Sequence, residues 1–493
     1  MRLALTLACL GASALALTAQ EAVQPLTLED AIKLALANNR SIKVDAFSRG
    51  IARANLLAAY GAFDPALSFN RSKSENYSLS LPSVDNGFLP LATLVRTDNY
   101  SLSFGGILPW GLQYSLVGNA TNQRGSYNGF SDAFQTFGGV QVTQPLLRGF
   151  GFWGNPSLLG VRVAKADRAI SDWQYRQTVI DTVTQVVVAY SNLSLAHEYL
   201  RTAERSRDGA ASLLAENEKR FKVGSISDND VTSARARTAL REEGVLIAIQ
   251  QVRDSDNQLR LLLGESSFSN DGPLFAVEPL PPAEFTIHPA DDLKKAYTRR
   301  PDYQQGRLGV TKSRYNESYA RSQLLPQVDF VGSYGYNGLD SDFAASRRMV
   351  SNQDNRSYFA GLQVTVPLTF AEGRGKARAA RLGRQKAEAQ LSQLEENIAV
   401  SVTAAANQIE TTRKRVAATA AARKLNEDLL QAELKRLKAG PGSTFSVLYQ
   451  QDLLSQADAQ YFQALADQRT AIANYERETG TTLDDYHVTL TKP

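Results

Sequence analysis

The chain of 493 residues is poor in the residues that build thiol and metal chemistry. Its one cysteine, Cys9, lies within the first twenty residues, and its three histidines, His197, His288 and His487, are far apart. The rest of the chain therefore has no thiol, which excludes disulfide scaffolds, cysteine nucleophiles and thiolate metal sites. The histidines fit no metal-ligand spacing. We expect no metal, no cofactor and no catalytic residues, hence no enzyme.

Long apolar runs are also missing. Beyond the first twenty residues no run approaches the ~18 to 20 apolar residues of a membrane-spanning helix, although 43% of the residues are hydrophobic. This excludes a polytopic helical membrane protein. Any membrane role must come from strands, because only helices and closed barrels satisfy their backbone groups in lipid. The 54 Lys and Arg nearly balance the 50 Asp and Glu, which does not indicate nucleic acid binding.

The beginning of the chain indicates export. Arg2 is followed by an apolar stretch at 3–17 and by small residues up to Ala19. This pattern is typical of a cleaved secretory signal, which we place at residues 1–19. A buried N-terminal helix is the alternative.

Proline is absent from two long stretches, 157–272 and 368–440. Because proline removes a backbone donor and breaks helices, its absence favours long helices there. Apolar periodicity predicts two long helices and two shorter return helices, at 157–221, 376–438, 228–263 and 444–479. At 1.5 Å per residue each long helix would span ~95 Å. Helices of globular proteins average only ~11 to 12 residues, so we expect rods rather than a globule.

The long helices carry apolar residues at alternating spacings of four and three, which is typical of a coiled-coil seam. One seam consists of Ile398, Val402, Ala405, Ile409, Thr412 and Val416. The other consists of Val179, Val183, Val186, Tyr190 and Leu193. By periodicity alone, amphipathic helices of a globular bundle are the alternative.

Two segments, 65–145 and 326–368, alternate apolar with polar or small residues, which predicts strands. Helices precede them at 27–60 and 290–324, the second with an extended break at Arg300, before Pro301. The order of helix, strands, long helix and return helix thus occurs twice and indicates an internal duplication. We place the first repeat at 26–264, a linker at 265–289, the second repeat at 290–483 and a C-terminal tail at 484–493.

The strands are too few to close a barrel within one chain. Four are clear, or six if Pro109–Gly111 reverses the chain within 97–122. Single-chain outer-membrane barrels start at ~8 strands, so several copies would have to pool theirs. Aromatic residues near the strand ends would lie at the membrane interface or simply pack at strand-to-helix junctions. They are Phe63, Trp110, Phe150, Phe152, Trp153 and Phe370.

The two helix turns read RFKVGSISDNDVTSARA at 220–236 and RLKAGPGSTFSVL at 436–448. Together with the strand exits Gln144–Leu146 and Val366–Leu368, they resemble the TolC family of outer-membrane channels over residues 26–483. The resemblance implies a mainly α fold with a β-barrel portion and a duplicated helix-strand-helix unit. In that fold a trimeric, twelve-stranded transmembrane β-barrel joins a long periplasmic α-helical tunnel.

The resemblance also implies function and partners. Such a channel is a passive outer-membrane conduit of a tripartite efflux pump or type I secretion system and extends into the periplasm. It acts as a homotrimer with a periplasmic adaptor, an inner-membrane transporter and outer-membrane lipids, and without nucleic acid. The alternatives are a periplasmic adaptor, which needs compact β domains and one hairpin, and a structural coiled-coil protein, which would lack the strand blocks.

The periplasmic end of the tunnel must close at rest, and the resemblance places the turns there. Candidate gate residues are Gly224, Asp228, Asp230, Arg436, Lys438 and Gly440. Asp230 matches a family aspartate that holds the entrance shut through an ionic link. The family's basic partner falls near Gly442 and its constricting aspartates near Ser446 and Tyr449, so those charges are not kept. Lys222, Arg436 or Lys438 would have to substitute. Plain capping of the helix after Ser227 is the alternative role of Asp228 and Asp230.

Overall fold

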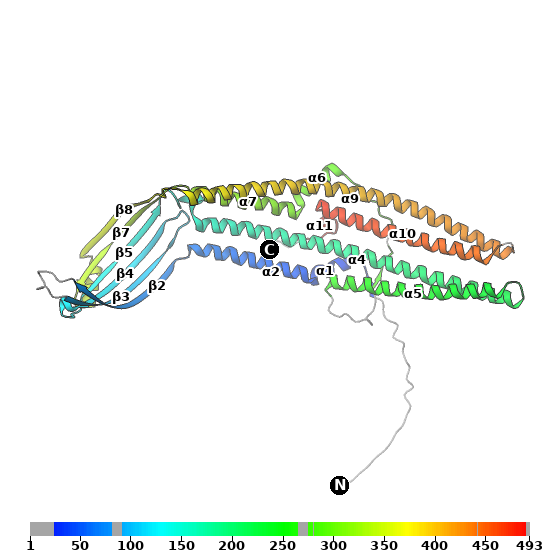
Figure 1. The fold of residues 1–493 in the computed structure, drawn as a ribbon, viewed down its shortest axis with the longest axis horizontal. Helices are drawn as coiled ribbons and strands as arrows, with labels where there is room; N and C mark the ends of the chain where they lie inside the picture. The colour runs from blue at the N-terminus through cyan, green and yellow to red at the C-terminus, as the bar shows by residue number, and fades with distance from the viewer. Residues whose placement is uncertain (1–23, 81–90, 265–274, 280, 441, 490–493) are drawn as a thin grey trace, which may run out of the picture. The chain divides into compact units, whose positions relative to one another are not determined.

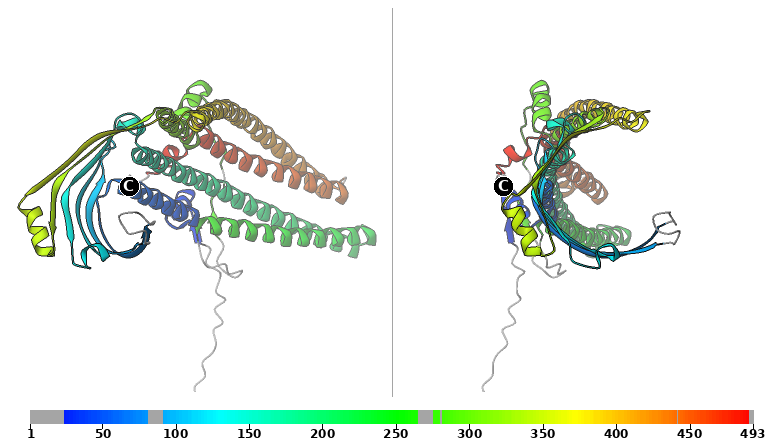
Figure 2. Two further views of the ribbon diagram at one scale, coloured as in Figure 1. Left: turned by 60° about the vertical axis from the view of Figure 1, so that its left-hand side comes forward. Right: turned by 90° about the vertical axis from the view of Figure 1, so that its left-hand side faces the viewer.

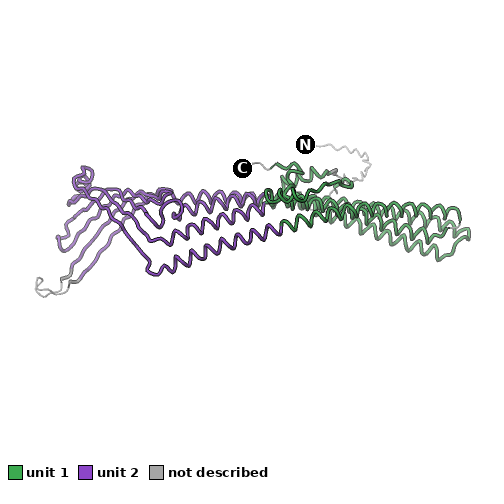
Figure 3. The backbone as a smooth tube through the Cα atoms, turned by 90° about the horizontal axis from the view of Figure 1, so that it is seen from above, with its two compact units in different colours: residues 1–44, 177–300, 398–493 green, residues 45–176, 301–397 purple. Residues whose placement is uncertain are grey.

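The computed structural model describes residues 24–80, 91–264, 275–279, 281–440 and 442–489, and we number its elements as in Figure 1. The expected signal at 1–19, with Cys9, lies outside the described residues. The chain forms two compact units, shown in Figure 3. Unit 1 takes residues 1–44, 177–300 and 398–493, and unit 2 takes 45–176 and 301–397. Each unit therefore draws on both repeats.

Unit 2 is built around one antiparallel sheet of six strands, in the order β2-β3-β4-β5-β7-β8. The strands are β2 Ala66–Ser80, β3 Leu91–Ile107, β4 Gln113–Gly125, β5 Phe134–Pro145, β7 Gln327–Asp340 and β8 Asn355–Thr365. Four come from the first repeat and two from the second, and β5 pairs with β7 to join them. Because β3 and β4 pair along 13 positions, residues 97–122 do form two strands, as the larger of the two predicted counts requires.

The two repeats differ in length between the prolines that border their strands. Pro65 and Pro145 are 80 positions apart, whereas Pro326 and Pro367 are 41 apart. The additional residues of the first repeat correspond to the extra pair of strands. The sheet thus departs from the two strands per repeat that the resemblance implied.

The long helices follow the predicted positions closely. Three short helices were not predicted, and one of them, Phe343–Ser351, interrupts the segment 326–368 that was expected to form strands. The helices lie in the following order along the chain. They are α1 Leu28–Asn38, α2 Arg40–Tyr60, α3 Gly151–Gly154, α4 Pro156–Lys222, α5 Asp228–Leu263, α6 Pro289–Arg299, α7 Pro301–Ser322, α8 Phe343–Ser351, α9 Ala371–Ala439, α10 Thr444–Thr479 and α11 Thr482–Asp485. The long helices α4 and α9 contribute to both units. Both return helices, α5 and α10, have their predicted bounds.

The core of unit 1 lies along the predicted seams. Val179, Val183, Val186, Tyr190 and Leu193 of α4 are buried, and so are Ile398, Val402, Ile409, Thr412 and Val416 of α9. Ala406 is buried in place of the predicted Ala405. One window of α4 is apolar enough for a membrane span by composition, contrary to the expectation from the sequence, but 72% of it is buried inside the structure. It is therefore weak evidence for a span, since core helices give the same signal.

The helix predicted at 27–60 is interrupted. Asn39 has extended backbone angles, φ −55° and ψ 129°, and separates α1 from α2. Its side-chain oxygen accepts from the backbone N–H of Ser41 at 2.9 Å, so it caps the new helix. Its amide nitrogen donates to the carbonyl of Leu262 at 2.8 Å, at the end of α5. The break at Asn39 thus allows its side chain to connect the end of α1 to the end of α5.

The second repeat uses the same construction. The predicted break at Arg300 is confirmed, with φ −63° and ψ 123°, and the Arg300 guanidinium donates to the carbonyl of Glu478 at the end of α10. Gly264 and Gly480 end the two return helices with φ of 75° and 74°. In both repeats, therefore, a short helix and a return helix meet at their ends.

Two short elements fall where the sequence predicted a linker and a tail. Within 265–289 the structure forms β6 Phe275–Val277, which pairs in parallel with β1 Gln24–Leu26. Near the end of the chain, α11 packs against α10. These segments are folded parts of unit 1.

Candidate functional site

One face of the sheet in unit 2 is apolar and exposed. The register places one residue of each strand in a continuous row, and all six are 40 to 72% exposed. The row is Leu67, Phe104, Leu116, Val140, Tyr334 and Tyr358. Burying so much exposed apolar surface would be favourable by ~25 cal/mol for each Å² removed from water. A row of this kind across a whole sheet marks a surface that meets lipid or another protein.

The opposite face is polar and almost free of charge. A neighbouring row on that face is Asn70, Ser101, Asn119, Phe137, Asn337 and Asn355. Within the described strands the only charged residue on this face is Asp329. An exposed apolar face opposite a hydrated amide and hydroxyl face is the pattern of a pore wall, in which alternate residues meet lipid and water. The alternation predicted for 65–145 and 326–368 is confirmed where these segments form strands β2, β3, β4, β5, β7 and β8.

Charges on the apolar face lie mainly in the halves of the strands farthest from the helices. They are Arg71, Lys73 and Glu75 of β2, Arg96 and Asp98 of β3, Arg124 of β4, Asp340 of β7 and Arg356 of β8. Arg96 pairs with Glu75 at 2.7 Å, and Arg124 pairs with Asp98 and, at 3.4 Å, with Asp132. Lys73 lies opposite Asp98 in the register. On β2, β3 and β4 the apolar side chains nearest the helices thus give way to a group of paired charges, as expected where a wall leaves the lipid.

The additional hairpin is anchored at its turn. Gly111 has φ +100°, and its N–H donates to the carbonyl of Leu108 at 2.8 Å, so the chain reverses at Pro109–Gly111. The buried Asn155, just before α4, donates to the carbonyls of Leu108 and Pro109 at 3.4 and 3.0 Å. The base of the hairpin is therefore tied to the start of the long helix.

Helix α8 covers part of the apolar face (Figure 2). Ser346 is fully buried and its hydroxyl lies 2.8 Å from that of Thr136 on β5. The rings of Phe343 and Phe134 are 5.8 Å apart. Helix α8 can lie this close to β7 only because residue 338 is glycine, since a Cβ there would lie 2.0 Å from the Ser346 carbonyl oxygen.

Most of the predicted aromatic residues lie exposed at the helix-proximal end of the sheet. Trp110, Phe150, Phe152 and Trp153 are 44 to 60% exposed. The Arg162 guanidinium lies 4.6 Å from the ring centroid of Trp153. Exposure of these rings favours an interfacial belt over packing at the junction.

In unit 1 the first helix turn shows what Asp230 does within one chain. Gly224 has φ +75°, and its N–H donates to the carbonyl of Phe221 at 2.9 Å. The Ser227 N–H and hydroxyl donate to the Asp230 carboxylate at 3.1 and 2.8 Å, which forms a capping box. These hydrogen bonds lower the pKa of Asp230. The capping interpretation therefore accounts for Asp230 in the isolated chain.

The second turn repeats the construction without the carboxylate. Gly440 has φ +108°, and the Ser443 hydroxyl accepts from the N–H of Ser446 at 3.1 Å. The turn requires a glycine at position 442, because a Cβ there would lie 2.4 Å from the Leu437 backbone nitrogen. Gly224 and Gly440, Ser227 and Ser443, and Gly264 and Gly480 are all separated by the same offset in the sequence, 216 positions.

The basic candidates do not meet the acidic ones. Arg436 pairs with Glu433 of its own helix at 2.9 Å. Lys222, Lys438 and Asp228 are exposed and have no ion pair with any residue that the structure describes. The structure therefore brings none of the predicted basic substitutes to Asp230.

An ion-pair cluster that the sequence did not reveal links the two return helices. Asp452 of α10 accepts from Arg237 at 2.6 Å and from Arg241, both on α5. All three side chains are about one-third exposed. Burial and the neighbouring Arg237 lower the pKa of Arg241. The i, i+4 spacing of the arginines was the only sequence signal, and it indicates no partner by itself.

Comparison with known proteins gives a family match. The model of the family described as "Outer membrane efflux protein" matches residues 109–265 and 293–481, more than half of the chain. The alkaline protease secretion protein AprF of Pseudomonas aeruginosa is 24% identical over 211 residues, which are 42% of this chain and 42% of AprF. The matched region thus spans less than half the length of this relative.

Solved structures share the fold at low sequence identity. The CmeC outer membrane channel of Campylobacter jejuni is 16% identical, with a TM-score of 0.68 over 92% of this chain and 86% of CmeC. The outer membrane protein VceC of Vibrio cholerae is 16% identical, with a TM-score of 0.67 over 92% of this chain and 96% of VceC.

Proposed function

Because the chain belongs to the outer membrane efflux protein family, we propose that it is the outer-membrane channel of a tripartite efflux pump or type I secretion system. The observation that carries the proposal is the sheet of unit 2, with its exposed apolar row opposite a row of amide and hydroxyl side chains. Such a wall needs lipid on one side and water on the other. In this proposal the role of the chain is passive conduction.

Several copies of the chain close the barrel. The sheet leaves one edge of β2 and one edge of β8 without a neighbouring strand in the described chain. An open edge in lipid leaves backbone groups unsatisfied, at several kcal/mol for each group. We propose that β2 of one copy pairs with β8 of the next in a homotrimer. Six strands from each copy then give an eighteen-stranded barrel, wider than the twelve strands that the resemblance implied.

The helical unit extends into the periplasm and meets the partners there. The paired turns at Gly224 and Gly440 form the end at which a periplasmic adaptor and an inner-membrane transporter dock. The likeness to a protease secretion protein, AprF, supports the type I secretion branch of the proposal.

The resting gate is proposed to use the link between the return helices. Asp452 holds Arg237 and Arg241 within one chain, about three helical turns from the Gly440 turn at ~3.6 residues per turn. Outward movement of α5 away from α10 would break both ion pairs. Asp230, Asp228, Gly224 and Gly440 then shape the turns, and Arg436 and Lys438 remain available to partners.

Matched lysine substitutions on β4 test the pore wall. Leu116→Lys places a charge on the apolar face, where a lysine at the bilayer midplane costs ~2–4 kcal/mol, so it should lower the yield of assembled protein in the outer membrane. Ser115→Lys places the same charge on the polar face. It should assemble normally and shift the ion selectivity of single channels in planar bilayers towards anions.

The result can also contradict the proposal. Equal assembly of both variants, or purified wild-type protein that never forms discrete pores, would exclude a barrel wall built with this register. The second outcome would favour an adaptor or a structural coiled-coil protein.

A further inference from the structure

The first turns of α9 carry an excess of positive charge. Residues 371–386 contain six basic residues and one acidic residue, Glu372. The helix dipole disfavours cations in the first turn of a helix, where Arg374 lies. The excess therefore does not stabilise the helix that carries it, and its reason lies in what the side chains contact. The basic residues are Arg374, Lys376, Arg378, Arg381, Arg384 and Lys386.

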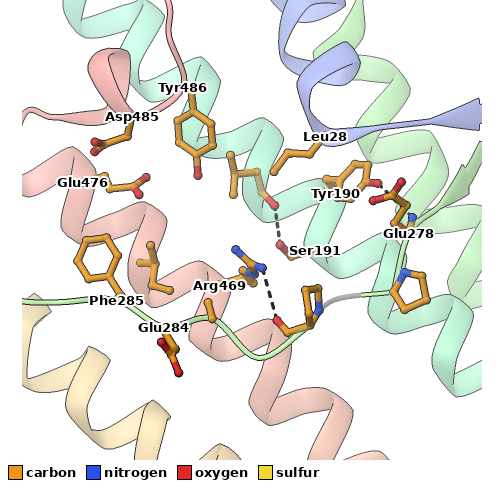
Figure 4. Close-up of a pocket in the computed structure, with 15 residues that line it drawn as sticks. Leu28, Tyr190, Ser191, Glu278, Glu284, Phe285, Arg469, Glu476, Asp485 and Tyr486 are labelled. Atoms are coloured by element: carbon orange, nitrogen blue, oxygen red, sulfur yellow. Dashed lines mark hydrogen bonds between the residues drawn. The ribbon is translucent and has the colours of Figure 1, made fainter.

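Charged side chains that face the interior of the chain have partners there. In unit 1, the wall of the cavity in Figure 4 includes Arg469 and Glu476 of α10. Arg469 donates to the Pro281 carbonyl at 3.4 Å, and the buried Glu476 accepts from the Tyr486 hydroxyl. A charged group that has no partner within the chain is therefore a sign of a partner outside it.

Three arginines of α9 have no such partner. Arg374, Arg378 and Arg381 are exposed and form no ion pair with any residue that the structure describes. They lie at positions i, i+4 and i+7, hence on one face of the helix, and we call them the arginine stripe. Arg384 lies on another face and donates to Glu317 of α7 at 2.5 Å. The stripe thus does not face α7, the neighbouring helix of its own chain.

The stripe also points away from the polar face of the sheet. Lys376 lines a cavity together with Tyr319 and Gln323. Tyr319 and Gln323 line a second cavity with Thr143 and Asp329, whose side chains belong to the polar face. Two arginines of the stripe are each two positions from Lys376, so at ~100° per residue they point ~160° away from it. The stripe therefore lies on the side of the apolar face.

The apolar face leads directly to the stripe. Leu362 and Val364 of β8, and Val366 and Leu368 beyond its end, are 48 to 96% exposed. Strand β8 continues into α9 (Figure 1), and the stripe begins six positions after Leu368. At ~1.5 Å per residue it extends ~10 Å along the helix axis, about the distance over which a charged membrane surface acts in salt. An apolar surface followed by cations matches a lipid core followed by anionic headgroups.

A neighbouring copy in the proposed barrel would not neutralise the stripe. Pairing of β8 with β2 of the next copy would bring the α2 that precedes β2 beside α9. Residues 46–63, which include most of α2, contain no Asp or Glu. The stripe would therefore keep its charge in the assembled protein.

We propose that the arginine stripe binds the phosphates of anionic phospholipid headgroups in the periplasmic leaflet of the outer membrane. The inference rests on the proposed function, because the apolar face must lie in lipid. Guanidinium groups bind phosphate through paired hydrogen bonds, and basic residues beside a membrane surface attract anionic lipids. An acidic protein would match the charge of the stripe but not the adjoining apolar surface, whereas lipid matches both.

Native mass spectrometry of the purified full-length protein tests the inference. Dioleoylphosphatidylglycerol, which is anionic, and dioleoylphosphatidylcholine, which is zwitterionic, are titrated separately, and the bound lipids are counted. The wild type should bind phosphatidylglycerol at least ~10-fold more tightly than phosphatidylcholine. A roughly tenfold rise in ammonium acetate concentration should reduce this preference, because salt screens exposed charges.

Variants that remove charge assign the preference to the stripe. Arg374→Gln, Arg378→Gln and Arg381→Gln together should abolish most of it, whereas lysine at the same three positions keeps the charge and should retain part of it. The control removes three exposed charges from the part of α9 in unit 1 and should keep the full preference. It combines Arg413→Gln, Lys414→Gln and Lys435→Gln.

Three outcomes would overturn the inference: equal affinity of the wild type for the two lipids, a preference that salt does not change, or an unchanged preference in the glutamine variant. The first would favour an acidic protein as the occupant. Neither result on the wild type depends on the folding of a variant. Pores are recorded in planar bilayers from the same preparation, so protein that conducts without a lipid preference contradicts this inference and leaves the proposed function intact.

Discussion

Single residues fix the points at which the helices of unit 1 change direction. Asn39 ends α1, caps α2 and holds the end of α5, while Gly264 and Gly480 allow the return helices to end in the left-handed region. Asp230 closes a capping box at the first turn, where the second turn uses a serine pair. Local geometry therefore explains these residues before any role in gating is assigned to them.

Gly264→Ala should destabilise the protein. The positive φ disfavours any side chain, and a Cβ would lie 2.6 Å from the Asn38 carbonyl oxygen. We expect a loss of ~1 kcal/mol or more, measured as a lower thermal midpoint in detergent. Gly244→Ala is the matched control in the same helix, because nothing lies within 4 Å of its Cβ. It should leave the midpoint unchanged or raise it, and equal losses in both variants would contradict this explanation.

Glu476 should make stability depend on pH. Its pKa rises from 4.5 to about 7 on folding, first because of burial. The folded state therefore binds the proton more tightly, and this stabilisation is full below pH 4.5 and is lost as the pH rises through about 7. The loss is on the order of 3 kcal/mol at most.

Denaturant midpoints at pH 5 and pH 8 measure this effect. The wild type should lose more stability between the two values than Glu476→Gln, which cannot titrate. Parallel losses would place the titrating group elsewhere.

At the scale of elements, the two return helices are the parts of unit 1 best placed to move. Each has its own capped start and glycine end. The Asp452 cluster is a polar connection between them. Its partly exposed ion pairs are weak individually, at ~0–1 kcal/mol, which suits a contact that must open.

Asp452→Asn should loosen this connection and open the channel at rest. The expected result is a higher resting conductance in planar bilayers and greater leakage of a large antibiotic into cells. Asp428→Asn, which removes an exposed carboxylate of α9 that pairs with Lys424, is the control. If Asp452→Asn left the resting conductance unchanged and Asp230→Ala raised it, the gate would lie at the first helix turn and not at the Asp452 cluster.

At the scale of the whole molecule, the proposed trimer completes the six-stranded sheet. In the proposed trimer, lipid covers its apolar face, and neighbouring copies pair with the edges of β2 and β8 that have no partner strand among the described residues. In the proposed barrel, the extra hairpin, with Gly111 at its turn and Asn155 at its base, raises the number of strands that each copy contributes.

Native mass spectrometry of the detergent-extracted protein should show a trimer of the mature chain. Single-channel conductance should exceed that of a variant in which residues 91–125 are deleted and β2 is rejoined to β5, because fewer strands enclose a narrower pore. A monomer, or an equal conductance, would contradict the eighteen-stranded barrel.

The sequence by itself determined the helices, the strand faces and the duplication, because these depend on local periodicity and on the positions of proline and glycine. The bounds of α5 and α10 and the alternating residues of β3, β4, β7 and β8 followed directly. Tertiary structure alone decided the break at Asn39, since its reason is a hydrogen bond to Leu262, distant in sequence. It also decided the pairing of Asp452 with two arginines and the burial of Glu476. The partners of these polar and charged side chains lie in segments distant in sequence, and the periodicity of a segment carries no information about which distant segment it will contact.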